Sequence, residues 1–236
     1  MAASRKAFSS ILAMDSAGGA CSAALWRGGR VVAGRFELMR RGHAERLVPM
    51  IEAVMAEGAM SYADLGCVAV TLGPGGFTGV RIGLATARGL ALACGRPLVG
   101  VSNFLVLAAA AKTDAPPDGS LAVVIDAKRR DLYVQAFAAD LRPRTDPRSI
   151  LPEALAEFLP PGPLVLVGDG VAQATASLDA AGRAYALSRA PGVVDAARLA
   201  ELVASRELGA AVAASPEPLY LRPPDATPAG AASVRS

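Results

Sequence analysis

Residues 71–95, TLGPGGFTGVRIGLATARGLALACG, decide the fold that the rest of the chain must accommodate. They continue an apolar run from Cys67 that is short and rich in β-branched residues, which predicts a buried strand. The run ends in a glycine-rich turn at 73–76, and Thr78 is placed to cap the helix that follows. A strand, a glycine turn and a helix N-terminus in succession predict a seat for an anion.

The predicted helix over 79–94 is apolar on every side, which predicts that it is buried on every side. Gly79 and Gly83 lie four residues apart and Ala87 extends the row, so one face is nearly flat. Because glycine costs a helix roughly 1 kcal/mol relative to alanine, two of them indicate that another backbone approaches closely. That backbone belongs either to the same chain or to a second subunit, and the pattern leaves both interpretations open.

The composition predicts a globular protein of one large domain or two small ones. The chain has 236 residues, 53% of them hydrophobic, which is enough for a sizeable core. No apolar run reaches the roughly 18 residues of a membrane span, and the N-terminal apolar segment is too short for a secretory signal. Because Cys21, Cys67 and Cys94 form no CxxC motif, we expect a reduced, cytoplasmic protein without structural disulfides or zinc.

The formal net charge is +3, and the basic residues gather in small clusters. The clusters are Arg40-Arg41, Lys128-Arg129-Arg130 and several arginines within 142–148. Acidic residues are interspersed among them. This pattern favours a solvated surface over an RNA-binding stripe, and the stripe stays open as the second interpretation.

A strand that ends in aspartate occurs twice, each time followed by a turn and a second strand. The first copy spans 11–15 and 21–27, and the second spans 121–126 and 131–138. A boundary signal, DAPPDG at 114–119, separates the copies. We therefore expect two halves of related build, 1–113 and 119–222, and a disordered tail over 223–236.

The remaining elements follow from local patterns. A hairpin at Gly28-Gly29 leads to a third strand over 30–38, and a helix is expected from His43, with Pro49 at its start or at a bend. Its apolar stripe comprises Leu47, Met50, Ile51, Val54 and Met55. We also expect strands at 97–101 and 164–167, helices at 104–111 and 194–208, the latter capped by Asp195, and a proline-rich loop over 142–152.

Several kinds of catalytic site are poorly supported. His43 is the single histidine, so neither a HExxH zinc site nor a Ser-His-Asp triad has independent support. Walker-type phosphate binding needs a lysine after the glycine loop, and Phe77-Thr78 stands there instead. What remains is a fold that holds phosphates between its halves, with Asp15 and Asp126 holding a hydrated cation. The competing interpretation is that each aspartate only accepts hydrogen bonds from its own turn.

Several runs of the sequence resemble the bacterial TsaB (YeaZ) family. They are ILAMD at 11–15, CSAAL at 21–25, HAERLVPM at 43–50, GPGGFTGVRIG at 73–83 and GLALACGRPLVG at 89–100. Shorter matches are IDA at 125–127, DLY at 131–133 and PLYLR at 218–222, so the resemblance is close over 11–138 and thin beyond. The chain departs from the family at Gly76, where serine is common, and at Ser16-Ala17, where Thr-Ser is common. The second departure weakens the nucleotide prediction.

The resemblance implies an α/β protein with an actin-like ATPase or sugar-kinase-like (ASKHA) fold, in which two duplicated subdomains have mixed sheets flanked by helices. It also implies a role in making threonylcarbamoyladenosine next to the anticodon of tRNAs that read codons starting with A. In this family the protein is a non-catalytic scaffold that binds and activates the transferase TsaD. TsaE joins the pair, and tRNA is reached indirectly through the complex.

The resemblance further implies that the helices at 43–57 and 78–94 form a dimerisation surface. The predicted interface residues are His43, Leu47, Met50, Ile51, Val54, Gly79, Val80, Gly83, Leu84 and Ala87. It also makes the second-subunit interpretation of the glycine row the favoured one. Without TsaD we expect a homodimer, because Leu47, Ile51, Val80 and Leu84 would otherwise leave a large apolar patch in water.

The metal-binding histidine pair of the catalytic paralogue corresponds, by the same resemblance, to Asn103 and Leu107. Asparagine is a poor ligand for such a metal and leucine is none. We therefore expect a subunit that is not itself an enzyme, with no required cofactor and at most weak binding of ATP or ADP. The alternative is a small-molecule kinase or ATPase of the same fold that uses Asp15 and Asp126.

Overall fold

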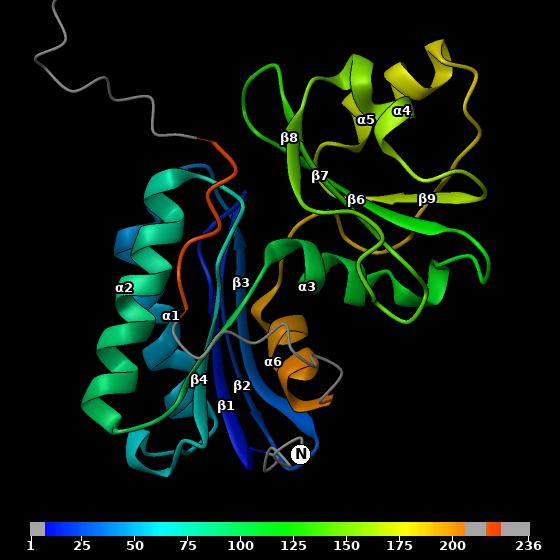
Figure 1. Cartoon of the computed structure of the whole chain (residues 1–236). Coiled ribbons are helices and arrows are strands. Elements are labelled where there is room, and N and C mark those ends of the chain that lie inside the picture. Colours follow the sequence, from blue (N-terminus) through cyan, green and yellow to red (C-terminus); the bar gives the residue numbers. More distant parts are fainter. Residues whose placement is uncertain (1–7, 206–215, 223–236) are drawn as a thin grey trace, which may run out of the picture.

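The chain folds into two lobes, each built on a five-stranded mixed sheet (Figure 1). The computed structural model describes residues 8–205 and 216–222. The first sheet comprises β1 (Ser10–Asp15), β2 (Ala20–Arg27), β3 (Arg30–Leu38), β4 (Cys67–Thr71) and β5 (Leu98–Val101). The second comprises β6 (Ser120–Asp126), β7 (Leu132–Phe137), β8 (Arg148–Ile150), β9 (Leu164–Val167) and β10 (Ala186–Leu187).

The two sheets share one strand order. The first runs β3-β2-β1-β4-β5, with β1 antiparallel to β2 and parallel to β4. The second runs β8-β7-β6-β9-β10, with β6 antiparallel to β7 and parallel to β9. Asp15 and Asp126 therefore stand at corresponding ends of β1 and β6. The internal repeat and the mixed-sheet α/β fold predicted from the sequence are confirmed.

Helices α1 (His43–Glu57) and α2 (Phe77–Cys94) cover one face of the first sheet (Figure 1). Their apolar side chains meet those of β1, β2 and β4 in a closed core. α1 starts at the predicted residue and contains Pro49 within it. The N-cap of α2 is Gly76, which makes no side-chain capping hydrogen bond, so the prediction that Thr78 caps this helix is wrong.

A second core joins the two lobes. α6 (Ala196–Ser205) covers the opposite face of the first sheet, and α3 (Asn103–Ala110) packs against both α6 and the second sheet (Figure 1). Phe104 on α3, Leu199 on α6 and Phe137 on β7 are all buried in this core. The predicted boundary near residue 119 thus separates the two sheets, but α6 returns from the second half to pack on the first lobe.

The outer face of the second sheet is covered by α4 (Leu155–Phe158) and α5 (Val171–Ala180). Short 3-10 turns occur at η1 (Tyr62–Asp64), η2 (Lys112–Asp114) and η3 (Pro152–Ala154). The predicted loop over 142–152 contains β8, so that prediction is wrong where this three-residue edge strand pairs with β7. α5 buries only Ala174 and Leu178, which explains why its weak apolar pattern gave no prediction.

Residues 216–222, which we call the C-terminal strap, run beside α2 and then turn to the second lobe (Figure 1). The Arg88 side chain donates to Pro216 O at 2.6 Å, and Arg222 pairs with Asp131 at 3.3 Å.

The remaining predictions concern α6 and the end of the chain. Asp195 accepts a hydrogen bond from the Ala197 amide at 2.9 Å, as its predicted capping role at the start of α6 requires. The predicted helix end at 208 and the predicted tail over 223–236 lie outside the described residues. No helix in the described ranges is long and apolar enough to cross a membrane.

Candidate functional site

A cleft of about 1490 Å³ lies between the lobes, where the turns after β1, β4 and β6 meet. Its walls come from four parts of the chain that are distant in sequence. They are the β1–β2 turn at 16–19, the entry to α1 at 40–45, the start of α2 at 74–80 with Ile82, and the second lobe at 125–129 with Tyr133 and Asp169. Residues 219–222 of the C-terminal strap complete the lining.

Asp15 does not line this cleft. Its side chain is only 1% exposed, and one carboxylate oxygen, Oδ1, accepts hydrogen bonds from the Thr71 hydroxyl and, at 3.3 Å, from the Ala17 amide. The other oxygen, Oδ2, has no partner among the described residues. Burial raises the pKa of Asp15 to about 6 against the opposing effect of these two hydrogen bonds, and the charge of Asp195 adds to the rise.

The N-terminus of α2 packs on Ser16 and Ala17, the two residues directly after Asp15. The Gly76 amide donates to Ala17 O at 2.7 Å, and the Ser16 hydroxyl donates to Gly79 O at 2.9 Å. A Cβ on Gly79 would lie 2.1 Å from Ser16 O, and one on Gly83 would lie 2.8 Å from Ser16 Oγ. Of the two interpretations of the glycine row, the contacts therefore support packing within the chain.

The predicted interface residues are, with two exceptions, part of the first lobe's core. The buried ones are Leu47, Met50, Ile51, Val54, Val80, Gly83, Leu84 and Ala87. His43 and Gly79 are half-buried, and His43 Nε2 donates to Gly18 O at 3.2 Å. The prediction that this set forms an exposed apolar patch is wrong, because the apolar stripe of an amphipathic helix faces the sheet beneath it.

A different set of residues forms the outer surface of these two helices. Val48 on α1 is 47% exposed and Leu92 on α2 is 85% exposed, although both are large apolar residues. Small exposed residues accompany them, namely Ala44 and Ala56 on α1 and Ala85 and Gly89 on α2. We call these six residues the outer helix face. Reading the helices for apolar residues opposite the buried stripe would have found Val48 and Leu92.

In the second lobe the aspartate at the strand end faces the cleft. Asp126 accepts from the Lys128 amide at 2.7 Å, and its Oδ2 lies 3.0 Å from Lys128 Nζ. The same Nζ lies 3.0 Å from Oδ2 of Asp169, whose Oδ1 accepts from the Asp126 amide at 2.8 Å. Burial lowers the pKa of Lys128, but the hydrogen bonds and charges of Asp169 and Asp126 outweigh this and raise it. The ammonium group therefore stays charged between two carboxylates.

Sequence reasoning did not identify Lys128 and Asp169 as site residues. Asp169 follows β9 in the run Gly168-Asp169-Gly170, which occupies in the second lobe the place of the glycine turn after β4 in the first. The internal repeat could have predicted that position. Lys128 has a positive φ of 58°, a conformation rarely adopted by lysine, and no sequence pattern indicated it.

Two aromatic rings and an arginine form a stack at the start of α2. The ring centroids of Phe77 and Tyr220 are 5.5 Å apart, and the Arg81 guanidinium lies 3.6 Å from the Phe77 centroid. Arg81 Nε also donates to the Tyr220 hydroxyl at 2.9 Å. The stack fastens the C-terminal strap to α2 while leaving aromatic surface in the cleft.

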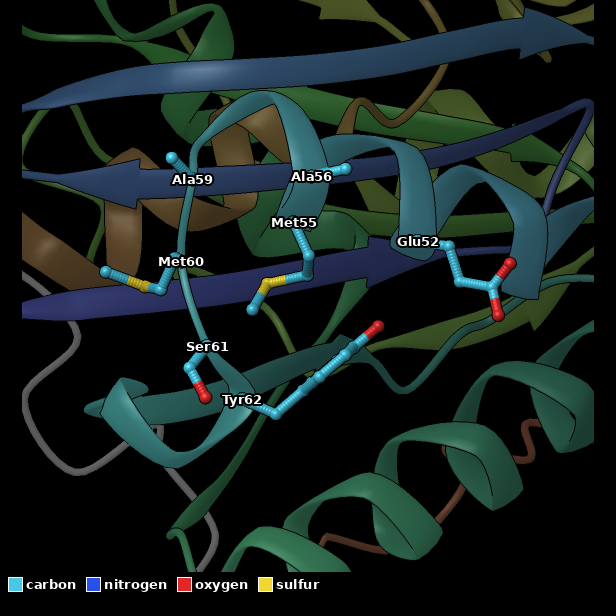
Figure 2. Close-up of a pocket in the computed structure, with 7 residues that line it drawn as sticks. All are labelled: Glu52, Met55, Ala56, Ala59, Met60, Ser61 and Tyr62. Atoms are coloured by element: carbon cyan, nitrogen blue, oxygen red, sulfur yellow. The ribbon is translucent and has the colours of Figure 1, made fainter.

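A smaller pocket of about 420 Å³ lies at the far end of α1, away from the cleft (Figure 2). Met55, Met60 and Tyr62 supply its apolar and aromatic walls, and Glu52 supplies a charged edge. Burial raises the pKa of Tyr62, and the charge of Glu52 adds to this. The pocket continues from the outer helix face through Ala56, which belongs to both.

Asn103, for which the resemblance predicted the position of a lost metal ligand, has a structural role here. Its side-chain Oδ1 accepts a hydrogen bond from the backbone amide of Gly73 at 3.0 Å. The backbone amide of Asn103 donates to Gly73 O at 2.8 Å. Leu107 is buried in the core between the lobes. No group of three or more metal-ligating side chains occurs within the part of the chain that the structure describes.

Two sheets of one strand order with a cleft between them define a protein of the actin-like ATPase and sugar-kinase-like class. A family model described as "TsaD: tRNA N6-adenosine threonylcarbamoyltransferase" matches residues 37–166. The chain belongs to this family, among its TsaB (YeaZ) members.

The relatives that support this assignment are bacterial. YeaZ from Pseudomonas aeruginosa superimposes with a TM-score of 0.73 at 29% identity, covering 90% of this chain and 100% of that one. TsaB of Escherichia coli is 41% identical over 130 residues, 55% of each protein. The tRNA N6-adenosine threonylcarbamoyltransferase of Erythrobacter litoralis is 50% identical over 68 residues, 29% of this chain and 20% of that enzyme. The match thus spans only about half the length of the curated TsaB relatives.

The fold class implies a nucleotide with a divalent cation in the cleft, held near the carboxylates that end β1 and β6. The residues present do not fit that group. Asp15 is 1% exposed and does not line the cleft, and both oxygens of Asp126 are engaged by Lys128, whose ammonium lies where a cation would have to approach. A divalent cation could reach Asp126 only by displacing a charge already paired there.

Proposed function

We propose that this chain is a non-catalytic subunit in the formation of threonylcarbamoyladenosine, the modification made next to the anticodon of tRNAs that read codons starting with A. In this proposal it binds and activates TsaD, the subunit that transfers the threonylcarbamoyl group. The family match and the TsaB names of several relatives support the pathway. Because its proposed partner modifies tRNA, the proposal also places this chain in the cytoplasm.

The single observation that carries the binding role is the outer helix face. Val48 and Leu92 are exposed on two helices whose main apolar stripes are already buried in the core. Exposed large apolar residues flanked by small ones allow another helix to approach closely. We propose that TsaD covers this face, and that a second copy of this chain covers it when TsaD is absent.

The rest of the proposed assembly depends on this contact. TsaE joins the pair to form a ternary complex, and tRNA is engaged through the complex as a whole. No cofactor is required by this chain in the proposal, and weak binding of ATP or ADP would be incidental. Catalysis is assigned to TsaD because Asn103 and Leu107 are committed to the turn after β4 and to the core of this chain.

The test is to co-purify this chain with TsaD and to measure tRNA modification with and without it. The double variant Val48→Glu, Leu92→Glu should lose co-purification and lower modification, because two charges would be buried at the contact. The matched control is Leu151→Glu, Leu187→Glu in the second lobe, whose residues are 45% and 57% exposed. If both double variants bind TsaD equally well, the outer helix face is not the contact.

A kinase or ATPase acting on a small molecule is the alternative, favoured by one observation, the large cleft faced by Asp126. Titration of the chain with ATP and magnesium decides between the two. Sub-millimolar binding with turnover that is lost in Asp126→Asn would favour the enzyme. Formation of the modified nucleoside by this chain unaided would refute the non-catalytic role.

A further inference from the structure

The fold brings together two basic clusters that are far apart in the sequence. Arg40 and Arg41 precede α1 in the first lobe, and Lys128 and Arg129 follow β6 in the second. All four line the cleft between the lobes. Arginine and lysine side chains gathered on one concave surface are the usual electrostatic signature of a site for a phosphate backbone.

The charge balance of the cleft is positive. Among the described lining residues, five are basic and three are acidic; they are Arg40, Arg41, Lys128, Arg129 and Arg222 against Glu45, Asp126 and Asp169. Two of the three carboxylates are already paired with Lys128 at 3.0 Å. The first turn of α2, which also lines the cleft, carries no acidic residue, so its helix dipole adds to the positive potential.

The cleft also presents aromatic surface. Phe77 and Tyr220 are each 45% exposed even though they stack on one another and on Arg81. Exposed aromatic rings beside basic residues are typical of sites for unpaired nucleotides, because every base can stack on a ring. Neither α2 nor the C-terminal strap needs these exposed ring faces for its own packing.

We propose that the cleft binds unpaired nucleotides of the tRNA substrate. Arg40, Arg41 and Arg129 contact phosphates in this proposal, and bases stack on Phe77 and Tyr220. The proposal rests on the proposed function and deepens it, since it assigns this chain a direct contact with the RNA. Because Lys128 already pairs with both Asp126 and Asp169, binding requires no divalent cation.

The size of the cleft favours an RNA segment over a free nucleotide. Its volume of about 1490 Å³ exceeds the roughly 300–1,000 Å³ of pockets that enclose small molecules. Its basic residues lie on both lobes rather than around one phosphate seat. A chain of several nucleotides matches this spread of charge better than one nucleotide does.

The test uses the full chain and a fluorescently labelled, unmodified anticodon stem–loop RNA, with binding followed by fluorescence anisotropy. Affinity should fall steeply between about 50 and 200 mM salt. Arg40→Glu, Arg41→Glu should weaken binding at least about tenfold and flatten the salt dependence. The matched control is Arg27→Glu, Arg30→Glu, which makes the same charge change at the β2–β3 hairpin, at the other end of those strands.

The aromatic part of the proposal has its own variants. Phe77→Leu and Tyr220→Leu should each weaken binding by about five- to 150-fold without changing the salt dependence. A blunt RNA duplex of the same length should bind more weakly than the stem–loop. Affinity should be the same in magnesium and in EDTA.

Three results would overturn the proposal. The first is an equal loss of binding in the cleft variants and in the hairpin control. The second is equal affinity for the duplex and the stem–loop. The third is displacement of the RNA by micromolar ATP, which would make the cleft a nucleotide site.

Co-purification with TsaD separates this proposal from the proposed function. Arg40→Glu, Arg41→Glu should still bind TsaD through the outer helix face. If the wild-type chain binds TsaD but not the RNA, only the proposal for the cleft is refuted. If the wild-type chain does not bind TsaD, the proposed function is refuted, whatever the affinity of the chain for RNA.

Discussion

The ends of β1 and β6 occupy the same place in two lobes of the same strand order, yet they differ in how the carboxylate is treated. At the end of β1, Asp15 is 1% exposed and accepts hydrogen bonds from the Thr71 hydroxyl and the Ala17 amide. At the end of β6, Asp126 faces the cleft and is held by the ammonium group of Lys128. One site is closed by packing and the other by charge.

This difference shows two independent ways in which the strand-end carboxylate of a duplicated architecture can be kept from a ligand. Packing excludes the ligand sterically and places a carboxylate in a medium of low polarity, where its charge is unfavourable. An ion pair leaves the site open to water and is therefore sensitive to salt. The two closures should respond differently to mutation, pH and ionic strength, which the following predictions use.

The largest expected effect comes from filling the contact between α2 and the turn that follows Asp15. Gly79→Val should lower the free energy of unfolding by more than about 3 kcal/mol, since its Cβ would lie 2.1 Å from the Ser16 carbonyl oxygen. Gly89→Ala on the same helix is the control, because nothing lies within 4 Å of its Cβ and alanine should stabilise the helix by up to about 1 kcal/mol. Urea unfolding measures both. Equal stability of the two variants would show that α2 does not pack closely on the turn after Asp15.

The second effect depends on pH. Folding raises the pKa of Asp15 from 3.8 to about 6, so the folded state holds more protons than the unfolded state between these values. This group's contribution to stability should therefore be fully present below about pH 4 and be lost as the pH rises to about 6, by roughly 3 kcal/mol in total.

Asp15→Asn should abolish that loss, because asparagine does not ionise. The difference in free energy of unfolding between wild type and variant should therefore shift in favour of the variant from pH 4 to pH 7. Wild type and Asp15→Asn with parallel pH profiles would mean that Asp15 is not in an apolar environment.

The fold was largely predictable because its signals are local and repeated. Apolar runs ending in Asp15 and Asp126 define the two central strands, and the glycine turn after β4 marks the start of α2. The site was less predictable because it depends on contacts between distant residues. Whether Gly79 meets Ser16 or a second subunit is decided by packing across 63 residues of sequence, which the spacing of glycines does not encode.

Burial explains the error in the predicted interface. Leu47, Ile51 and Leu84 are apolar at helical spacing, and that pattern shows which side of a helix is buried without showing what buries it. The resemblance predicted a contact surface on α1 and α2, but the sheet of the same lobe already covers most of the residues named for it. Val48 and Leu92 lie outside that stripe, and a search for apolar residues opposite it would have found them.

The third prediction concerns the charge that closes the second site. Lys128→Met should lower the free energy of unfolding by about 1 kcal/mol at low salt, because Asp126 and Asp169 would face each other without a cation. Lysine and methionine are about equally unfavourable at the positive φ of residue 128. The change in free energy of unfolding therefore reports on the lost charge. The loss should shrink as salt is added, whereas the effect of Gly79→Val should not. A salt-independent loss for Lys128→Met would contradict closure by an ion pair.

The smallest effect is expected where the C-terminal strap meets the second lobe. Arg222→Gln removes a partly exposed ion pair with Asp131, and should cost about 0.5 kcal/mol or less. The lobes are held together instead by the buried core in which Phe104 of α3 meets Leu199 of α6 and Phe137 of β7. Because that core is shared, both lobes should still unfold in one cooperative transition in this variant, as followed by calorimetry and by urea titration with two spectroscopic probes. If Arg222→Gln instead gave two separate transitions, the strap rather than the shared core would couple the lobes, and the two sites could no longer be compared within one rigid frame.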